Sequence, residues 1–330
     1  MGGDFAPAHV VRGSLDALEE SGDRFSVVFV GPEKDIRDEL RRQAGQTGSG
    51  KQEAYTIVHA PDVIDMHDAP NAALKTKKRS SIGVGLELHR DGKADAFVSA
   101  GNTGAVLSAS TLILGRAKGV GRPTIGALVP TSSGPCLLVD AGTNVDCRPR
   151  HLFEFAVMGS IFVETMLGKS NASVGLLNVG EEASKGNAAA YEAFELLQKS
   201  ALNFAGNVEG RDVLTGKVDV VVCDGFVGNI LLKFGESVPA FLKAKLTRFA
   251  RQNVLNSLVA LIARGGLRSV MKELDYQEYG GVPLLGVNGV SIIGHGGSTP
   301  RAFKNMIYRA EEAVRRNVNG RVQEAMLKYA

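Results

Sequence analysis

Short runs of β-branched residues alternate with helical segments along most of this chain, and that alternation constrains the fold more than any other feature. Strands that alternate with helices are typical of a parallel sheet whose crossover connections are helical. The sequence therefore predicts an α/β fold with a mostly parallel sheet. The runs expected as strands are Ser26–Val30, Tyr55–His59, Ala96–Ser99, Thr124–Val129, Cys136–Val139, Ser173–Asn178 and Val218–Cys223.

Helix-start and turn signals complete the expected order of elements. First-turn proline favours a helix start at Pro149, and Asn288-Gly289 between two apolar runs is typical of a tight β-hairpin. No repeat or low-complexity linker divides the chain, so we expect residues 1–330 to form one α/β domain. The expected helices are Thr103–Leu114, Pro149–Leu167, Asn187–Lys199, a long helix from Val227, and a basic helix from Pro300 to about Lys328.

Composition excludes several classes of protein. The net charge is only +3, Trp is absent and aromatic residues make up 6% of the chain, which argues against a nucleic-acid-binding surface. Cys136, Cys147 and Cys223 form no CxxC pair, so neither a structural zinc site nor a disulfide framework is indicated. No signal peptide and no apolar run of spanning length is present. We therefore expect a reduced, cytoplasmic protein that meets a membrane from one side, if it meets one at all.

Polar, glycine-bearing clusters follow several of the expected strands. In open α/β sheets, ligands bind beyond the carboxyl ends of strands, where glycine lets backbone amides approach an anion and helix N-termini favour negative charge. We expect these clusters to lie around one crevice. They are residues 99–102 (SAGN), 140–143 (DAGT), 178–181 (NVGE) and 224–225 (DG).

Together with other segments, these clusters resemble the phosphate acyltransferase family of bacterial phospholipid synthesis, usually called PlsX. The resemblance implies a Rossmann-like three-layer α/β/α sandwich, as in isocitrate and isopropylmalate dehydrogenases. It also implies transfer of a long-chain fatty acyl group from acyl carrier protein to inorganic phosphate, with no cofactor and no metal. The matching segments are residues 1–7 (MGGDFAP), 99–105 (SAGNTGA), 176–182 (LLNVGEE), 185–187 (KGN), 224–229 (DGFVGN), 279–289 (YGGVPLLGVNG) and 295–296 (HG).

The sequence departs from that family at its start. Family members carry a short first strand that ends in Asp-Ala ahead of the Met-Gly-Gly-Asp run, whereas this sequence begins at Met1. We expect this to be a trimmed or misassigned start. A sheet that truly lacked the strand would be less stable.

The implied reaction needs hydrogen-bond donors rather than an activated nucleophile. Phosphate is largely dianionic near neutral pH and a thiolate leaves readily, so the site must hold the anion and stabilise the oxyanion. We predict that Lys185 compensates the negative charge, that Asn102, Thr103 and Asn229 are neutral donors, and that His295 either protonates the leaving sulfur or stabilises a turn. The expected substrate-binding residues are Gly3, Asp4, Ser99, Gly101, Asn102, Thr103, Asn187, Asp224 and Gly225.

A cysteine nucleophile is the rival mechanism, with Cys223 beside Asp224 as its candidate. Its place at the end of an apolar strand favours a small buried hydrophobic residue instead. We therefore predict direct attack by phosphate.

Two surfaces are expected to meet partners. Lys75, Lys77, Lys78 and Arg79 form a basic run that would steer acidic acyl carrier protein, although most charge runs are solvated helical turns. Residues 234–274 are expected to form a projecting amphipathic helical hairpin. Its apolar side chains beside cations favour contact with an anionic membrane, and a homodimer interface is the competing explanation. We expect dimer contact near the base and membrane contact at a tip around Leu258, Leu261, Ile262 and Leu267.

The sequence leaves three other functions open. The expected fold also resembles phosphate acetyltransferases, so transfer of an acetyl or butyryl group from coenzyme A is one alternative. A nicotinamide-linked oxidation is weakened because no GxGxxG follows a first strand. A non-enzymatic lipid-binding scaffold would need the apolar hairpin but not the convergent donors.

Overall fold

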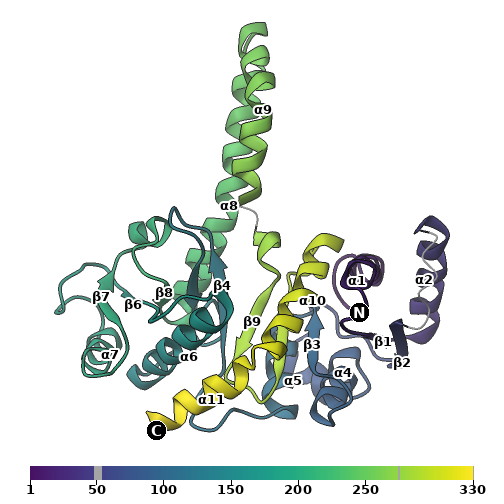
Figure 1. Cartoon of the computed structure of the whole chain (residues 1–330), viewed down its shortest axis with the longest axis horizontal. Helices are drawn as coiled ribbons and strands as arrows, with labels where there is room; N and C mark the ends of the chain where they lie inside the picture. The colour runs from purple at the N-terminus through teal and green to yellow at the C-terminus, as the bar shows by residue number, and fades with distance from the viewer. Residues whose placement is uncertain (48–53, 274–275, 330) are drawn as a thin grey trace.

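The computed structural model describes residues 1–47, 54–273 and 276–329. Its strands form an eight-stranded sheet in the order β3-β10-β9-β4-β5-β8-β6-β7 and a separate parallel pair, β1-β2 (Figure 1). The strands are β1 (Val27–Gly31), β2 (Tyr55–His59), β3 (Ala96–Ser99), β4 (Thr124–Val129), β5 (Cys136–Val139), β6 (Val174–Leu177), β7 (Phe204–Val208), β8 (Val220–Val222), β9 (Val282–Leu285) and β10 (Val290–Ile293).

Helices connect these strands and cover the sheet. The α-helices are α1 (Ala8–Ser21), α2 (Glu33–Thr47), α3 (Pro70–Thr76), α4 (Ser81–Arg90), α5 (Thr103–Ile113), α6 (Pro149–Leu167), α7 (Ala188–Gln198), α8 (Gly225–Ala250), α9 (Val254–Glu273), α10 (Pro300–Arg315) and α11 (Val318–Lys328). Two short 3₁₀ helices are η2 (Gly210–Thr215) and η3 (Tyr276–Tyr279).

Strand direction divides the large sheet into two halves. Strands β5, β8, β6 and β7 run parallel to one another, and β3 runs parallel to β10. Between the halves, β9 is antiparallel to both β10 and β4, and β4 is antiparallel to β5. The predicted mostly parallel α/β fold is confirmed, but the two parallel sets point in opposite directions.

Alternate side chains of β5 pack against helices on opposite faces of the sheet, which gives a helix–sheet–helix arrangement of three layers. Leu137 and Val139 belong to the apolar core that includes α6, whereas Cys136 and Leu138 belong to a core on which Leu231 of α8 packs. Successive residues of a strand point to opposite faces, so helices on both faces require a strand that is apolar throughout. All four residues of β5 are buried, as this arrangement demands.

Two sequence-based expectations about elements were wrong. The single basic helix from Pro300 is two helices, because Asn317 adopts a left-handed backbone (φ 51°), which asparagine tolerates better than most residues. This break lets α11 turn and pack on α6, with Val318, Val322 and Met326 in the core. The strand β7 was not anticipated, and Gly206 at positive φ interrupts its apolar pattern.

The connection between β9 and β10 also differs from a tight two-residue turn. The strands pair as Ile292 with Pro283 and Ile293 with Val282, which leaves a longer loop over residues 286–289. The side-chain amide of Asn288 donates to the carbonyls of Leu114 and Arg116. This asparagine therefore ties the loop to the end of α5 instead of closing a type I′ turn.

Helices α8 and α9 pack on each other and project far from the sheet (Figure 1). The turn between them covers Arg251 to Asn253, so the tip of the hairpin is formed by the end of α8 and the start of α9. The tip expected around Leu258 to Leu267 is wrong: Leu258 lies one turn below the start of α9, and Leu267 lies farther toward the base. The expected boundary at residue 274 lies outside the described residues.

Within the described ranges, no helix combines the length and the apolar content of a membrane-spanning segment.

Candidate active site

Strand direction separates the predicted site residues into two groups. Strands β6 and β8, which precede Lys185 and Asn229, end at one edge of the sheet. Strands β3 and β10, which precede Asn102 and His295, point the other way and end at the opposite edge. The antiparallel central strands thus reverse the direction between the two halves, and a single crevice shared by all the clusters stays a prediction.

A buried carboxylate organises the first edge. Asp140 follows β5 and is fully buried. Its Oδ1 accepts hydrogen bonds from the N–H groups of Gly142 (2.9 Å) and Thr143 (2.8 Å), and its Oδ2 accepts from the N–H (2.7 Å) and side-chain amide (2.8 Å) of Asn144. These four bonds compensate the cost of burying the charge and hold residues 141–144 in one conformation.

The first turn of α8 packs directly on this loop. The N–H of Gly225 donates to the carbonyl of Asn144 (2.8 Å), and the Asp224 carboxylate caps the helix by accepting from the N–H of Val227 (2.9 Å). A Cβ on Gly225 would lie 2.8 Å from the nitrogen of Thr143, and one on Gly228 would collide with the Asp140 carbonyl. Both glycines are therefore needed to bring the positive end of the α8 dipole against the loop.

The side chain of Asn229 lies against Gly142, and its amide is available to donate a hydrogen bond to a ligand. A Cβ on Gly142 would come 3.2 Å from the Cβ of Asn229 and 3.3 Å from its Oδ1. Gly142 also has φ 136°, a conformation that side-chain-bearing residues rarely adopt. Asn229 is half-buried, and its amide makes no hydrogen bond within the described part of the chain. It is thus an oriented but unused donor.

Lys185 stands at the same edge, on the segment after β6. The side-chain amide of Asn178 donates to the Lys185 carbonyl (3.0 Å), and Asn207 donates to the carbonyl of Glu182 (2.9 Å), so the segment is anchored at two points. Asn187 caps α7 by accepting from the N–H of Ala190 (2.9 Å). The Lys185 side chain is exposed, and no ion pair among the described residues includes it. Its charge is therefore available to an anion.

At the opposite edge, Asn102 is a structural residue. Its Oδ1 caps α5 by accepting from the N–H of Ala105 (3.0 Å). Its amide nitrogen donates to the carbonyls of Asp65 (3.1 Å), Met66 (3.2 Å) and Asp68 (3.0 Å). Both amide hydrogens are therefore used to position the loop over residues 65–68, and the role of Asn102 as a donor to phosphate stays a prediction.

The other residues of this edge surround the start of the chain. Asp4 donates its N–H to the Gly296 carbonyl (3.0 Å), and a Cβ on Gly3 would lie 2.8 Å from the Ala100 carbonyl oxygen. The Nδ1 of His295 accepts from the N–H of Gly297 (3.0 Å), which leaves the proton of a neutral imidazole on Nε2. This hydrogen bond fits the turn-stabilising role, and the choice between the two predicted roles of His295 stays open. Gly101 donates its N–H to Ser99 Oγ (3.2 Å), and Thr103 is the exposed first residue of α5.

The thiol of Cys223 is unsuited to nucleophilic attack. It is buried beside the Asp140 carbonyl, and burial, followed by the nearby charges of Asp140 and Asp224, raises its pKa well above the ordinary value. The thiolate is the reactive form of cysteine, so this side chain stays protonated at neutral pH.

The basic run lies on the side of the molecule occupied by α3 and α5. Lys77 is neutralised by Asp68 (2.6 Å) and Asp65 (3.8 Å), which raise its pKa chiefly through the hydrogen bond to Asp68. Lys75, Lys78 and Arg79 are exposed, and no ion pair within the described ranges involves them. Three of the four predicted cations are therefore available to a partner.

Sequence reasoning placed Asp140 at a strand end but did not anticipate its four hydrogen bonds. It also missed Asn144, which joins the Asp140 carboxylate to the first turn of α8. Gly142 belongs to the cluster at residues 140–143 that the sequence analysis identified. Its pairing with Asn229 depends on how α8 crosses β5, which no local pattern encodes.

Solved structures show the class of fold. A phosphotransacetylase from Streptococcus pyogenes superimposes with a TM-score of 0.62 at 17% identity, covering 94% of this chain and 92% of that one. A branched-chain phosphotransacylase from Enterococcus faecalis gives a TM-score of 0.53 at 15% identity, covering 88% of this chain and 99% of that one. These similarities show that this chain shares the α/β fold of those structures.

Sequence comparison then establishes the family. The family model described as "Fatty acid synthesis protein" matches residues 1–321. A phosphate acyltransferase from Pelotomaculum thermopropionicum is 46% identical over 314 residues, covering 95% of this chain and 90% of that protein. Another from Chlorobaculum tepidum is 46% identical over 335 residues, covering 99% of this chain and 100% of that protein. The chain belongs to this fatty acid synthesis protein family, and the resemblance to phosphate acyltransferases is confirmed.

Proposed function

We propose that this protein is an acyltransferase that moves a long-chain fatty acyl group from acyl carrier protein to inorganic phosphate, giving acyl phosphate for phosphatidic acid and phospholipid synthesis. The observation that carries the proposal is the 46% identity to phosphate acyltransferases over nearly the whole chain. The oriented and unused donors at the Lys185 edge support the same chemistry.

The reaction requires no covalent enzyme intermediate. An oxygen of the phosphate dianion attacks the thioester carbonyl, a C–O bond forms, and the C–S bond breaks to release the thiolate of the carrier. The proton of monohydrogen phosphate stays on the product or exchanges with water, so charges and atoms balance. The protein must orient the anion and stabilise the oxyanion that develops on the carbonyl.

We assign these tasks to the edge formed by β5, β6 and β8. Lys185 pairs with the phosphate, while the amide of Asn229 and the N-terminal turn of α8 at Asp224 and Gly225 face the reacting group. Asn187 holds the segment that bears Lys185. His295 follows a strand that ends at the other edge, so protonation of the sulfur is not assigned to it.

The acyl carrier protein docks, in this proposal, on Lys75, Lys78 and Arg79. Exposed cations without a local carboxylate partner attract an acidic protein over a distance comparable to the Debye length. Lys77 contributes less because Asp68 already neutralises it.

The projecting hairpin serves dimerisation and membrane contact. From Phe241 to Phe249 every residue of α8 is exposed, so the outer half of this helix contacts little beyond α9. A second copy covering Phe234 (68% exposed) and Phe241 (59%) near the base would bury this surface.

The tip combines apolar and basic side chains. Phe249, Val254 (77% exposed) and Leu255 (68%) lie beside the exposed Arg248 and Arg251. This combination favours an anionic lipid surface. We therefore place the protein in the cytoplasm with reversible attachment to the inner face of the cell membrane.

The deciding experiment compares acyl donors. Purified protein is incubated with palmitoyl-acyl carrier protein and phosphate, and acyl phosphate and free carrier are measured. We expect both products in equal amounts, only when phosphate is present. Acetyl-, butyryl- and palmitoyl-coenzyme A are the matched donors, because a phosphotransacetylase-type fold also suits acyl transfer from coenzyme A. Faster turnover with a coenzyme A donor would establish that alternative. If no donor were turned over, a non-enzymatic lipid-binding scaffold would be the remaining function.

A further inference from the structure

Two exposed arginines, Arg122 and Arg148, stand at the edge of the sheet assigned to catalysis and have no part in the reaction proposed above. Arg122 lies two residues before β4, and Arg148 ends the segment that joins β5 to α6. Because β4 is antiparallel to β5, the amino end of β4 and the carboxyl end of β5 lie at the same edge. Both arginines therefore belong to the edge that holds Asp140 and Asn229.

Asn144 links the Arg122 segment to the catalytic loop. Its side-chain amide donates to the carbonyl of Pro123 (2.9 Å) as well as to Oδ2 of Asp140 (2.8 Å). Its own backbone carbonyl accepts from the N–H of Gly225 (2.8 Å), in the first turn of α8. Since Pro123 directly follows Arg122, the backbone at Arg122 is fixed relative to the start of α8.

The two guanidinium groups are not neutralised. Arg122 donates from Nη1 to the backbone carbonyl of Asp146 (3.2 Å), and no ion pair among the described residues includes Arg122 or Arg148. The nearby carboxylate of Glu154 is paired with Arg150 (3.2 Å). Asp146 is the one exposed acidic residue of the segment over residues 141–149, so it offsets only part of the charge of the two arginines.

His151 shows that both arginines act on the same region. This histidine lies in the first turn of α6, and its Nδ1 accepts from the N–H of Arg148 (3.1 Å). Burial lowers the pKa of His151 most, the positive charges of Arg122 and Arg148 lower it further, and Glu154 raises it. One imidazole therefore experiences the field of both guanidinium groups.

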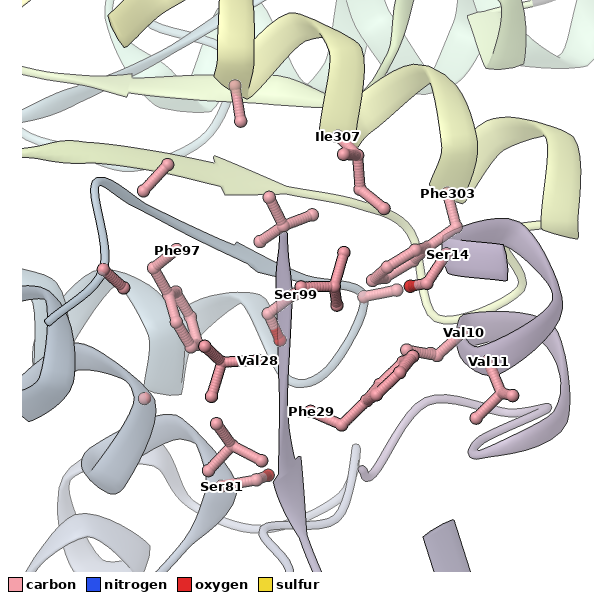
Figure 2. Close-up of a pocket in the computed structure, with 18 of the residues that line it drawn as sticks. Val10, Val11, Ser14, Val28, Phe29, Ser81, Phe97, Ser99, Phe303 and Ile307 are labelled. Carbon is pink, nitrogen blue, oxygen red and sulfur yellow. The ribbon is translucent and has the colours of Figure 1, made fainter. Parts of the chain in front are cut away.

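The large cavity of the molecule suits an anion less well. Figure 2 shows this cavity of about 520 Å³ between β1 and β3, lined mostly by aliphatic and aromatic side chains such as Val28, Phe29 and Phe97. An anion placed there would lose its hydration with little compensation. Exposed arginines instead offer a planar fork of donors that matches two oxygens of a phosphate group.

We propose that Arg122 and Arg148 form a subsite for the phosphoryl group on the arm of the acyl donor, the phosphate ester through which acyl carrier protein bears its thioester. This inference rests on the proposed function, because a donor of that class brings a phosphate ester to this edge together with the reacting carbonyl. Inorganic phosphate remains assigned to Lys185. The two anions of the reaction are then held by different cations of one edge.

The test uses two small donors that differ in one phosphoryl group. Dodecanoyl-4′-phosphopantetheine carries the phosphate ester without a carrier protein, and dodecanoyl-pantetheine lacks that ester. We expect Arg122→Ala and Arg148→Ala each to raise the KM for the phosphorylated donor about tenfold, the effect of losing one charge-assisted hydrogen bond at an exposed site. The KM for dodecanoyl-pantetheine should stay unchanged.

Equal changes in KM with both small donors, or no change with either, would overturn the subsite. The KM for dodecanoyl-acyl carrier protein should rise by the same factor as that for the phosphorylated small donor. A rise with the carrier protein alone would assign the arginines to acidic side chains of the carrier, and a rise with dodecanoyl-coenzyme A but not with the carrier would assign them to coenzyme A. Either result would overturn the proposal.

Arg321→Ala is the matched control. Arg321 is another exposed arginine that makes no ion pair within the described part of the chain, and it lines a hollow together with Thr165, near the other end of α6. Its loss should leave the KM for both small donors unchanged. A rise equal to that of Arg122→Ala would attribute the effect to net charge and reject the subsite.

A binding measurement tests the subsite without turnover. 4′-Phosphopantetheine, pantetheine and inorganic phosphate are each added to the protein, and the ring proton resonances of His151, assigned by their loss in His151→Gln, are followed against pH by NMR. A bound anion favours the charged imidazole, so 4′-phosphopantetheine should raise the pKa of His151 and pantetheine should not. The rise should be absent when Arg122→Ala and Arg148→Ala are combined.

The outcomes separate the subsite from the proposed reaction. A rise with 4′-phosphopantetheine in a protein that turns over no donor would support the subsite and reject the reaction. Turnover without any such rise would support the reaction and overturn the subsite. An equal rise with the same concentration of inorganic phosphate would show a site for any phosphate anion, which would overturn the assignment to the donor's arm.

Discussion

The α-carbon of Gly142 lies against the side chain of Asn229, so that a Cβ at position 142 would come 3.2 Å from the Asn229 Cβ. Gly142→Ala forces this neighbour to move and strains a backbone at φ 136°. We expect kcat for acyl transfer to fall at least about tenfold, because an oriented donor is worth that much or more in the transition state. Steady-state turnover with acyl carrier protein substrate measures it.

Gly134→Ala is the matched control for that substitution. Gly134 also has a positive φ (103°), but a Cβ at this position would have no neighbouring atom within 4 Å. Both variants should lose a few degrees of Tm through backbone strain, which costs about 1–2 kcal/mol. Equal activity losses in the two variants would show that strain, not the displacement of Asn229, is responsible.

Lys185→Ala should weaken phosphate binding. The exposed ammonium has no carboxylate partner among the described residues, so its loss leaves the fold intact and removes a charge-assisted hydrogen bond. Such a bond is worth about 1.5–3 kcal/mol, which corresponds to a rise in the phosphate KM of about 10- to 100-fold. Lys199→Ala, which removes a surface cation paired with Glu195, should leave that KM unchanged. A phosphate KM unaffected by Lys185→Ala would remove this lysine from the site.

Cys223→Ala should remain active. Burial keeps the Cys223 thiol protonated at neutral pH, and the proposed direct attack by phosphate does not depend on it. We expect kcat within about twofold of the parent and a Tm lower by a few degrees, since the loss of one buried sulfur leaves a small cavity. Loss of turnover in a folded variant, or an acyl group trapped on Cys223 and seen by mass spectrometry, would favour a covalent mechanism.

Reversing the three available cations of the basic run should impair the encounter with acyl carrier protein. For Lys75→Glu, Lys78→Glu and Arg79→Glu combined, we expect kcat/KM for acyl carrier protein substrate to fall about 10- to 100-fold with kcat preserved at saturation. The defect should shrink as salt is raised, because screening weakens steering in the parent protein.

The control for this triple variant places the same charge change elsewhere. Lys118→Glu, Lys199→Glu and Arg211→Glu alter three exposed cations in other parts of the chain. A comparable loss of kcat/KM in this control would attribute the effect to net charge alone. Lys77 is left unchanged in both variants because its pair with Asp68 supports the loop over residues 65–68.

The local sequence pattern was enough to predict several helices and strands, because the residues that start and end them are chemically distinctive. β4 and β5 begin and end at the predicted residues because each is a short, mostly apolar run bounded by proline or aspartate. α6 begins at the predicted Pro149, where proline satisfies the first-turn geometry. These signals lie within a few residues of the boundary they mark.

Strand direction and side-chain partners could not be predicted in the same way. Whether β4 runs parallel or antiparallel to β5 depends on tertiary pairing, and this reversal moved Asn102 to the edge opposite Lys185. Asn102 looked like a donor for phosphate, yet its amide is used by carbonyls more than thirty residues away in the chain. Long-range hydrogen bonds of this kind leave no local signal.

The tip of the hairpin should decide membrane attachment. Val254 and Leu255 are largely exposed beside Arg251, and glutamate at both positions would place two negative charges in the lipid interface and oppose the cation. We expect Val254→Glu with Leu255→Glu to abolish co-sedimentation with phosphatidylglycerol vesicles while soluble turnover stays within about twofold. Leu258→Glu with Ile262→Glu, one to two turns below the tip, should reduce sedimentation less. Undiminished sedimentation of the tip variant at physiological salt would rule out this surface as the membrane contact.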